Sequence, residues 1–241
     1  MSTEFVLVHG AMHGAWCWED VAARLVAKGH RVVVPELPGH GRRAAEVRSA
    51  GAECYGRAVA EAMAQAGVSR AVLVGHSMGG LVIAKAAELV PRRIAHLVFL
   101  AAVVPAHGSS IALTNMTAPA RAALAAHVVG RGDGTFLHPA ETAWARWMGD
   151  LPRHDPRVSR ALARLTPQAA RPFFERVDLH RFDALTIPRT YIRCRRDAAV
   201  IPERAAATAA RLGVAPVDLD SAHDPMLSKP DELVRLLTRI A

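Results

Sequence analysis

The chain has 241 residues, of which 51% are hydrophobic, and a formal net charge of +8. This length suits one large domain with an inserted segment, and the apolar content is sufficient for a sizeable core. The positive charge consists mostly of arginines scattered in ones and twos, and aromatic residues make up only 5% of the chain. Because it lacks a dense basic block and aromatic stacking platforms, we expect no nucleic-acid partner.

Cysteine usage and the apolar runs indicate the compartment. Cys17, Cys54 and Cys194 show neither C-x-x-C nor metal-ligand spacing, which favours free thiols in a reducing environment. The first residues lack the basic and apolar regions of a signal peptide. The longest apolar run, 97–105, is far shorter than the ~20 residues of a membrane span. We therefore expect a cytoplasmic protein that does not associate with membranes.

Apolar runs and helical patterns alternate along most of the chain. Strands are predicted at 5–8, 31–34, 71–74, within 94–104, at 189–194 and at 216–219, and helices at 19–28, 54–66, 78–90, 203–212 and 230–240. Near-continuous Val, Leu and Ile strands separated by helices predict a parallel sheet that is covered on both faces. Ligands of such sheets bind at the carboxyl ends of the strands.

The segment 105–185 interrupts this alternation. It contains helical stretches at 118–127, 140–148 and 157–164, two of the four tryptophans and four of the six phenylalanines, among them Phe136, Phe173 and Phe174. Because it is too long for a loop in a compact domain, we predict a helical cap over the strand ends. The core domain would then comprise 1–104 and 186–241. The cap aromatics are expected to serve partly as cap core and partly as the wall of a substrate pocket.

A G-x-S-x-G motif at 75–79 follows the third predicted strand and precedes a helix. This strand–turn–helix context is typical of a nucleophile elbow, in which the serine adopts a strained backbone conformation. Gly75 and Gly79 would leave room for the turn, and Gly80 would let the helix pack closely on the sheet. The motif therefore predicts Ser77 as a nucleophile at the N-terminus of a helix.

A serine nucleophile requires a general base, which is itself oriented by an acid. His223 follows the last predicted strand and is the predicted base, whereas the other eleven histidines lie in turns, the cap, strand starts, the first loop or the elbow. Asp197 follows the preceding strand and is the predicted acid. Asp220 and Asp224 are its rivals, but their place in the short loop of His223 makes contact with its Nδ1 awkward.

The negative charge that develops on an attacked carbonyl oxygen requires two backbone donors. One is expected to be the N–H of Met78, directly after the nucleophile. The other is expected to be the N–H of Ala11, in the Gly-rich loop 9–14 after the first strand, where Gly10 permits a close approach. The loop lacks both phosphate-binding glycine patterns, so we predict no nucleotide site there.

These motifs together resemble the α/β-hydrolase superfamily over nearly the whole chain, and most closely the branch of plant methylesterases and hydroxynitrile lyases. The matching segments are F-V-L-V-H-G-A at 5–11, H-G-A-W at 13–16, G-H-S-M-G-G at 75–80, 191–202 around Asp197, and H-D-P-M-L-S-K-P at 223–230. The resemblance implies an α/β-hydrolase fold with a Ser77–His223–Asp197 triad. It also implies that Ala11 and Met78 supply the oxyanion donors.

Two positions depart from the lyase pattern. In the lyases a threonine follows the first-loop histidine and a lysine follows the catalytic histidine, whereas this chain has Gly10 and Asp224 there. These departures argue against a lyase. Related esterases tend to carry an apolar residue where Asp224 stands. We expect this acid either to favour the charged form of His223 or to disfavour anionic ligands.

The sequence thus predicts a serine hydrolase that cleaves a small, largely apolar carboxylic ester (a methyl or aryl ester or a lactone) through an acyl-enzyme. Met12, Trp144 and Trp147 are expected to bind the substrate, without any metal or organic cofactor. If the protein forms an oligomer, we expect a homodimer. Two alternatives stay open: a lyase or C–C bond hydrolase that uses the same triad, and a ligand-binding homologue without turnover.

Overall fold

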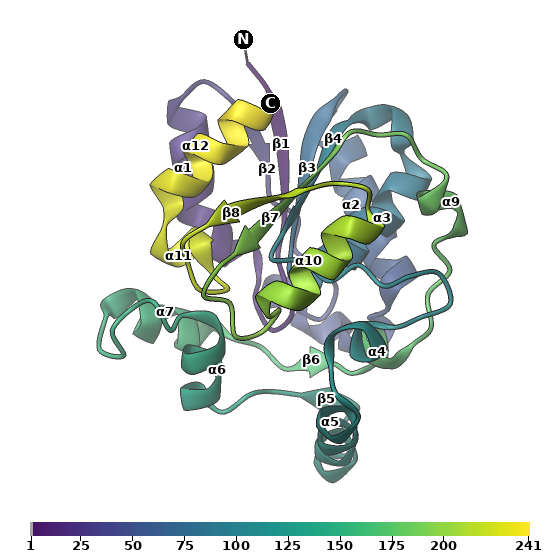
Figure 1. Ribbon diagram of the computed structural model, residues 1–241, viewed down its shortest axis with the longest axis vertical. Helices are drawn as coiled ribbons and strands as arrows, with labels where there is room; N and C mark the ends of the chain where they lie inside the picture. Colours follow the sequence, from purple (N-terminus) through teal and green to yellow (C-terminus); the bar gives the residue numbers. More distant parts are fainter. Residues whose placement is uncertain (1) are drawn as a thin grey trace.

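Six parallel strands form the central sheet of the computed structural model, which describes residues 2–241 (Figure 1). Their order across the sheet is β2-β1-β3-β4-β7-β8. The strands are β1 (Glu4–Val8), β2 (Arg31–Val33), β3 (Ala71–His76), β4 (Ile94–Leu100), β7 (Arg189–Cys194) and β8 (Pro216–Leu219). The winding direction reverses between β1 and β3. The loops after these two strands therefore meet at the edge where such sheets bind ligands.

Both faces of the sheet are apolar because helices cover both. Along β1, Phe5 and Leu7 belong to one buried cluster, and Val6 and Val8 belong to the other. All six residues of β3 are buried. The predicted near-continuous apolar strands are thus explained by alternate side chains entering two separate cores.

The helices divide between the two faces (Figure 1). One cluster includes residues of α2 (Ala52–Gln65), α3 (Gly79–Leu89), α9 (His180–Asp183) and α10 (Pro202–Arg211). The other includes residues of α1 (Glu19–Ala27), α11 (Pro225–Ser228) and α12 (Pro230–Ile240). The longer helices and the strands predicted for the core are all present, with bounds within two residues of those predicted. The α/β class is therefore confirmed.

The inserted segment lies across the carboxyl ends of the strands, at the bottom of Figure 1. It contains α4 (Ile111–Asn115), α5 (Ala118–Arg131), β5 (Thr135–Phe136), α6 (Ala140–Trp147), α7 (Pro156–Arg164), β6 (Gln168–Ala169) and α8 (Arg171–Phe174). The three predicted cap helices correspond to α5, α6 and α7. The antiparallel pair β5–β6 gave no signal in the sequence, because a two-residue strand has no periodicity.

The cap has its own apolar core, which includes Phe136, Trp147 and Met148 together with Met12 from the loop after β1. The later part of the segment returns to the main core, since Phe182 of α9 is buried in the same cluster as α3. The domain boundaries at 105 and 185 stay a prediction. Cap and core are also joined at the surface, where Arg164 of α7 contacts both carboxylate oxygens of Glu19 at 2.7 and 3.0 Å.

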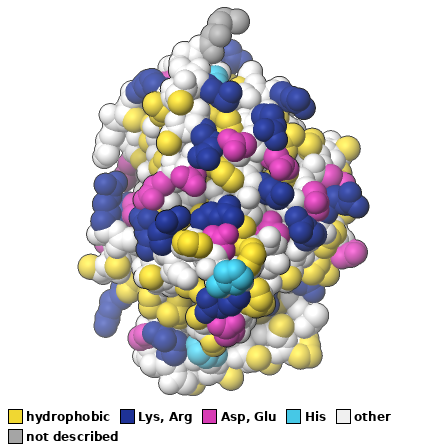
Figure 2. Space-filling model, turned by 90° about the vertical axis from the view of Figure 1, so that its left-hand side faces the viewer, with side chains coloured by type: hydrophobic (Ala, Val, Ile, Leu, Met, Phe, Trp, Pro, Cys, Tyr) yellow, Lys and Arg dark blue, Asp and Glu magenta, His cyan; other side chains and the backbone are white. Residues whose placement is uncertain are grey.

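Charged side chains of both signs are interspersed over the face shown in Figure 2. Many of them form ion pairs, such as Arg24–Asp231 between α1 and α12, with 2.8 Å between Nε and Oδ1. Such exposed pairs contribute only ~0–1 kcal/mol each to stability. Within residues 2–241, none of the helices combines the length and the apolarity that crossing a membrane requires.

Candidate active site

Ser77 lies in the tight turn between β3 and α3 and has a φ of +54°. This left-handed conformation is strained for a residue with a side chain, and the surroundings hold it in place. The Ser77 N–H donates to the carbonyl of Leu100 at 3.1 Å. A Cβ at Gly79 would lie 2.9 Å from the Val8 carbonyl oxygen, and a Cβ at Gly80 would lie 2.7 Å from the Ala102 Cβ. The turn therefore has the geometry that the glycine pattern predicts.

His223 and Asp197 are buried and in direct contact. The His223 Nδ1–H donates to Asp197 Oδ2 at 2.7 Å. The other carboxylate oxygen of Asp197 accepts hydrogen bonds from the backbone N–H groups of Ala199 and Val200, at 2.7 and 2.8 Å. Asp197 is thus fixed at both oxygens. Within residues 2–241, His223 Nε2 has no hydrogen-bond partner, so it is available to Ser77.

The two rivals of Asp197 are engaged elsewhere. Asp220 lies at the surface and pairs with Arg196, with 3.0 Å between Oδ1 and Nε. Asp224 is buried, but its Oδ2 accepts from His13 Nε2 at 3.0 Å. Of the three candidate acids, only Asp197 contacts the ring of His223 through a hydrogen bond.

Ser77 and His223 line one cavity of about 60 Å³ beneath the cap, and Ala11 and Met78 line it too. Within residues 2–241, neither the Ala11 N–H nor the Met78 N–H donates to a backbone carbonyl. Met78 immediately precedes α3, where the helix dipole favours negative charge. A Cβ at Gly10 would lie 2.8 Å from Ser77 Cβ, so glycine lets the first loop approach the serine.

Two of the three predicted substrate-binding residues, Met12 and Trp147, line this cavity, whereas Trp144 does not. The structure places Trp144 away from the cavity, where its indole N–H donates to the Leu151 carbonyl at 3.0 Å and its ring packs against the cap core. Sequence reasoning noted Phe136 and Phe173 as cap aromatics without placing them. The other lining side chains that it missed are Val103, Ile111, Asn115, His138, Arg146, Ala199 and Val200.

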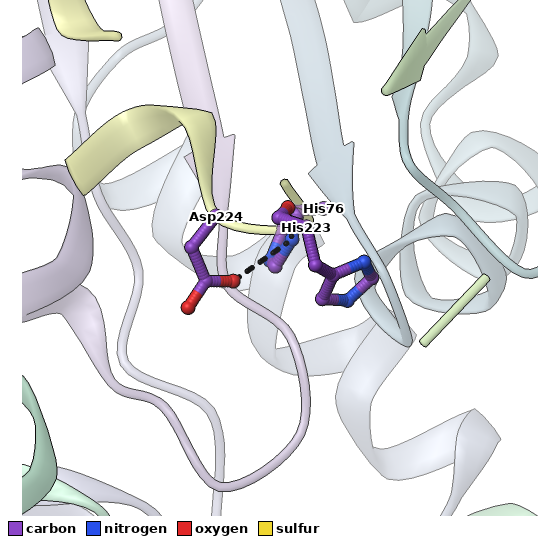
Figure 3. Close-up of side chains that lie close together, drawn as sticks. All are labelled: His76, His223 and Asp224. Atoms are coloured by element: carbon purple, nitrogen blue, oxygen red, sulfur yellow. Dashed lines mark hydrogen bonds and ion pairs between the residues drawn. The ribbon is translucent and has the colours of Figure 1, made fainter. Parts of the chain in front are cut away.

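Asp224 connects two further histidines rather than facing the cavity. Its Oδ1 lies 3.5 Å from His76 Nε2, the pair joined by a dashed line in Figure 3. Burial opposes charge on Asp224, but the nearby charge of His13 and the hydrogen bond from His13 outweigh it and lower the pKa of this carboxyl. For His13, burial likewise opposes charge, but Asp224 outweighs it and raises the pKa. Burial lowers the pKa of His76 well below its usual range.

His76, His223 and Asp224 place atoms of metal-binding type within 4.8 Å of one another. One ring nitrogen of each histidine is already in use. His223 Nδ1–H donates to Asp197, and His76 Nε2–H donates to the His223 carbonyl at 3.0 Å. We therefore interpret this group as a hydrogen-bonded cluster that joins the elbow to the histidine loop.

Comparison with known proteins identifies the class. Residues 5–236 match the model of the alpha/beta hydrolase family, so the chain belongs to this family, as its motifs predict. Esterase PIR7B from Oryza sativa subsp. japonica is 31% identical over 257 residues, covering 98% of this chain and 95% of that protein. Several methylesterases of Arabidopsis thaliana are also related.

Other similarities are partial or structural. Probable esterase PIR7A from Oryza sativa subsp. indica is 46% identical over 112 residues, and the match spans 43% of its length. An extracellular α/β-hydrolase from a Paenibacillus species has a TM-score of 0.90 at 26% identity, with 98% of each chain covered. That protein is described as sharing structural and functional homology with Tobacco Salicylic Acid Binding Protein 2. The predicted resemblance to plant methylesterases is thus confirmed.

Proposed function

We propose that this protein hydrolyses a small carboxylic ester through an acyl-enzyme formed on Ser77. The observation that carries the proposal is the buried 2.7 Å hydrogen bond between His223 and Asp197, beside a cavity that Ser77 also lines. A serine, a histidine and a carboxylate in chain order Ser–Asp–His are the arrangement of α/β-hydrolases. The esterase relatives support ester hydrolysis as the activity.

In the first half-reaction, Ser77 Oγ attacks the ester carbonyl carbon while His223 Nε2 accepts the hydroxyl proton. The carbonyl electron pair moves to the oxygen, where the N–H groups of Ala11 and Met78 stabilise the charge. One such donor typically contributes ~10²–10³ in rate. Collapse of the intermediate breaks the ester C–O bond, and His223 gives its proton to the departing alkoxide. Asp197 keeps Nδ1 protonated and stabilises the imidazolium.

In the second half-reaction, His223 accepts a proton from water as the water oxygen attacks the acyl carbon. The bond to Ser77 Oγ then breaks, the serine regains a proton from His223, and a carboxylic acid leaves. The balance of the two steps is ester plus water to acid plus alcohol, without a redox cofactor.

The cavity supports a compact substrate. The cavity is small, and Met12, Phe136, Trp147 and Phe173 provide apolar walls. A methyl or aryl ester or a lactone with a small acyl part fits these walls best. The protein would act on this substrate as a single catalytic unit, since the triad and both oxyanion donors come from one chain.

The two departures from the lyase pattern have structural reasons that favour the esterase. Gly10 lies against Ser77 with no room for a threonine side chain, and Asp224 pairs with His13 instead of lining the cavity. No lysine is found among the residues described as lining this cavity. The lysine of the lyase pattern therefore has no counterpart there, and Arg146 of the cap lines the cavity as a cation.

The test uses p-nitrophenyl acetate, a methyl aryl ester and mandelonitrile with the wild type and Ser77→Ala. We expect many ester turnovers per active site, a loss of more than about 10⁴-fold in Ser77→Ala, and background cleavage of mandelonitrile. A fluorophosphonate should label the wild type once, at Ser77. Rapid stereoselective mandelonitrile cleavage without ester turnover would show a lyase. A single modification without turnover would show a ligand-binding protein.

A further inference from the structure

Both ring nitrogens of His13 face acceptors. Nδ1 lies 2.8 Å from the Ala11 carbonyl oxygen, and Nε2 lies 3.0 Å from Asp224 Oδ2. A carbonyl and a carboxylate oxygen can only accept, so both nitrogens must carry a proton. His13 is therefore an imidazolium that is paired with the Asp224 carboxylate. The two side chains are 2% and 0% exposed, so water does not screen the pair.

The positions of the two partners connect the two loops that the proposed reaction requires. His13 is two residues after Ala11, whose N–H is a proposed oxyanion donor. Asp224 directly follows His223, the proposed base. The Asp224 N–H also donates to the Trp147 carbonyl of the cap at 2.9 Å. The ion pair thus fixes the spacing between the oxyanion loop and the histidine loop.

The oxyanion loop needs such fixing because its backbone is strained. Met12 has a φ of +63°, which residues with side chains rarely adopt. Residues of the cap bind the peptide groups of Met12. The Met12 N–H donates to Gln168 Oε1 at 3.2 Å, and the Met12 carbonyl accepts from the Thr166 N–H at 2.9 Å. The carbonyl of the preceding residue, Ala11, accepts a hydrogen bond from His13 Nδ1.

We propose that the buried His13–Asp224 ion pair positions the Ala11 N–H toward the reacting carbonyl and holds it in register with His223. This inference rests on the proposed esterase function. His13 and Asp224 act as positioning residues, since they act through Ala11 and the histidine loop. His76 extends the arrangement to the elbow, because its Nε2–H donates to the His223 carbonyl next to Asp224.

The kinetic test uses Asp224→Asn, His13→Gln and the double variant, with p-nitrophenyl acetate as the substrate. Active sites are counted by fluorophosphonate titration, so that misfolded protein does not enter kcat. Because a misplaced oxyanion donor affects the transition state more than the bound ester, we expect kcat to fall about 10–100-fold and KM to change by less than about threefold. A trifluoromethyl ketone, which forms a tetrahedral adduct, should lose affinity by a similar factor.

Two comparisons separate positioning from general stability. If the residues act as one pair, the double variant should be no slower than the slower single variant. Asp220→Asn, which removes a surface carboxylate of the same segment, should leave kcat and the inhibitor affinity unchanged. Unchanged kcat per titrated site, a loss confined to KM, or additive losses in the double variant would each overturn the proposal.

A measurement on the wild type keeps the proposal testable if the variants do not fold. In protein labelled with ¹⁵N-histidine, His13 should show protons on both ring nitrogens at pH 7, as the two acceptors require. A neutral His13 at this pH would overturn the proposal. Absence of ester turnover in the wild type would instead contradict the proposed function, since the NMR signal reports the pair independently of activity.

Discussion

At the scale of single residues, backbone hydrogen bonds determine which carboxylate can serve His223, the proposed catalytic base. Asp197 receives two backbone N–H groups on Oδ1 and the His223 ring on Oδ2, so its side chain has one orientation. Asp197 is three residues past the end of β7 and Asp220 is one residue past the end of β8, yet Asp220 points to the surface and pairs with Arg196. Orientation, rather than closeness in sequence to His223, separates these acids.

Asp197→Asn tests this assignment. An amide that presents its N–H₂ to His223 would favour the wrong ring tautomer, a change that costs about 10⁴ in kcat in the serine-protease triad. We expect a loss of this order in kcat/KM with p-nitrophenyl acetate, and less than about a twofold loss in Asp220→Asn. Thermal unfolding of both variants provides the control for folding. A larger loss in Asp220→Asn would show that the histidine loop supplies its own acid.

At the scale of elements, the site depends on how closely the elbow helix α3 approaches the sheet. Gly80 in its first turn has no room for a methyl group, because a Cβ there would lie 2.7 Å from Ala102 Cβ and 2.9 Å from the Val103 carbonyl oxygen. The resulting approach places the N-terminus of α3 beneath Ser77. The elbow is thus fixed by the packing of α3 as well as by its turn.

Gly80→Ala should therefore destabilise the protein by about 1–3 kcal/mol, which corresponds to a decrease of about 3–10 °C in Tm. Gly130→Ala is the matched control, since Gly130 lies within α5 and a Cβ there meets nothing within 4 Å. In an exposed helix this change should stabilise by about 0.5–1 kcal/mol. Equal effects of the two substitutions on Tm would contradict the packing argument.

At the scale of the whole molecule, the buried histidines couple stability to pH. His9 donates from Nδ1 to the Gly10 carbonyl and accepts at Nε2 from the Leu37 N–H, so the folded protein requires its neutral form. Burial lowers the pKa of both His9 and His76 well below 6.5. The pKa of His13 is raised, which has the opposite effect on stability.

Below pH 6.5 the unfolded chain takes up protons that folded His9 and His76 do not bind. The free energy of unfolding therefore decreases as the pH is lowered. His13, whose pKa is raised in the folded protein, contributes stability that changes mainly above pH 6.5, so it offsets little of this loss. Each neutral histidine would cost up to about 2 kcal/mol between pH 6.5 and pH 5. We expect Tm to decrease over this range, and to decrease less in His9→Gln, whose amide can both donate and accept. An equal decrease in the variant would contradict this role of His9.

The sequence by itself determined the alternation of strands and helices and the elbow, and it predicted the candidate triad Ser77, Asp197 and His223. These follow from local features: apolar periodicity, glycines at a strained turn, and polar residues directly after buried strands. The same local rules predicted the three longer cap helices, but not β5 and β6, which exist only because they pair with each other.

Only the tertiary structure decided which side chains meet. Trp144 and Trp147 lie one turn apart on α6, yet Trp147 lines the cavity while Trp144 packs in the cap core. Asp224 was expected to act on His223 or on ligands, and its carboxylate instead meets His13, which is 211 residues away in the chain. Sequence patterns show the periodicity of apolar residues and the neighbours of each residue along the chain. Contacts between distant loops depend on how the cap and the core pack, which no local pattern encodes.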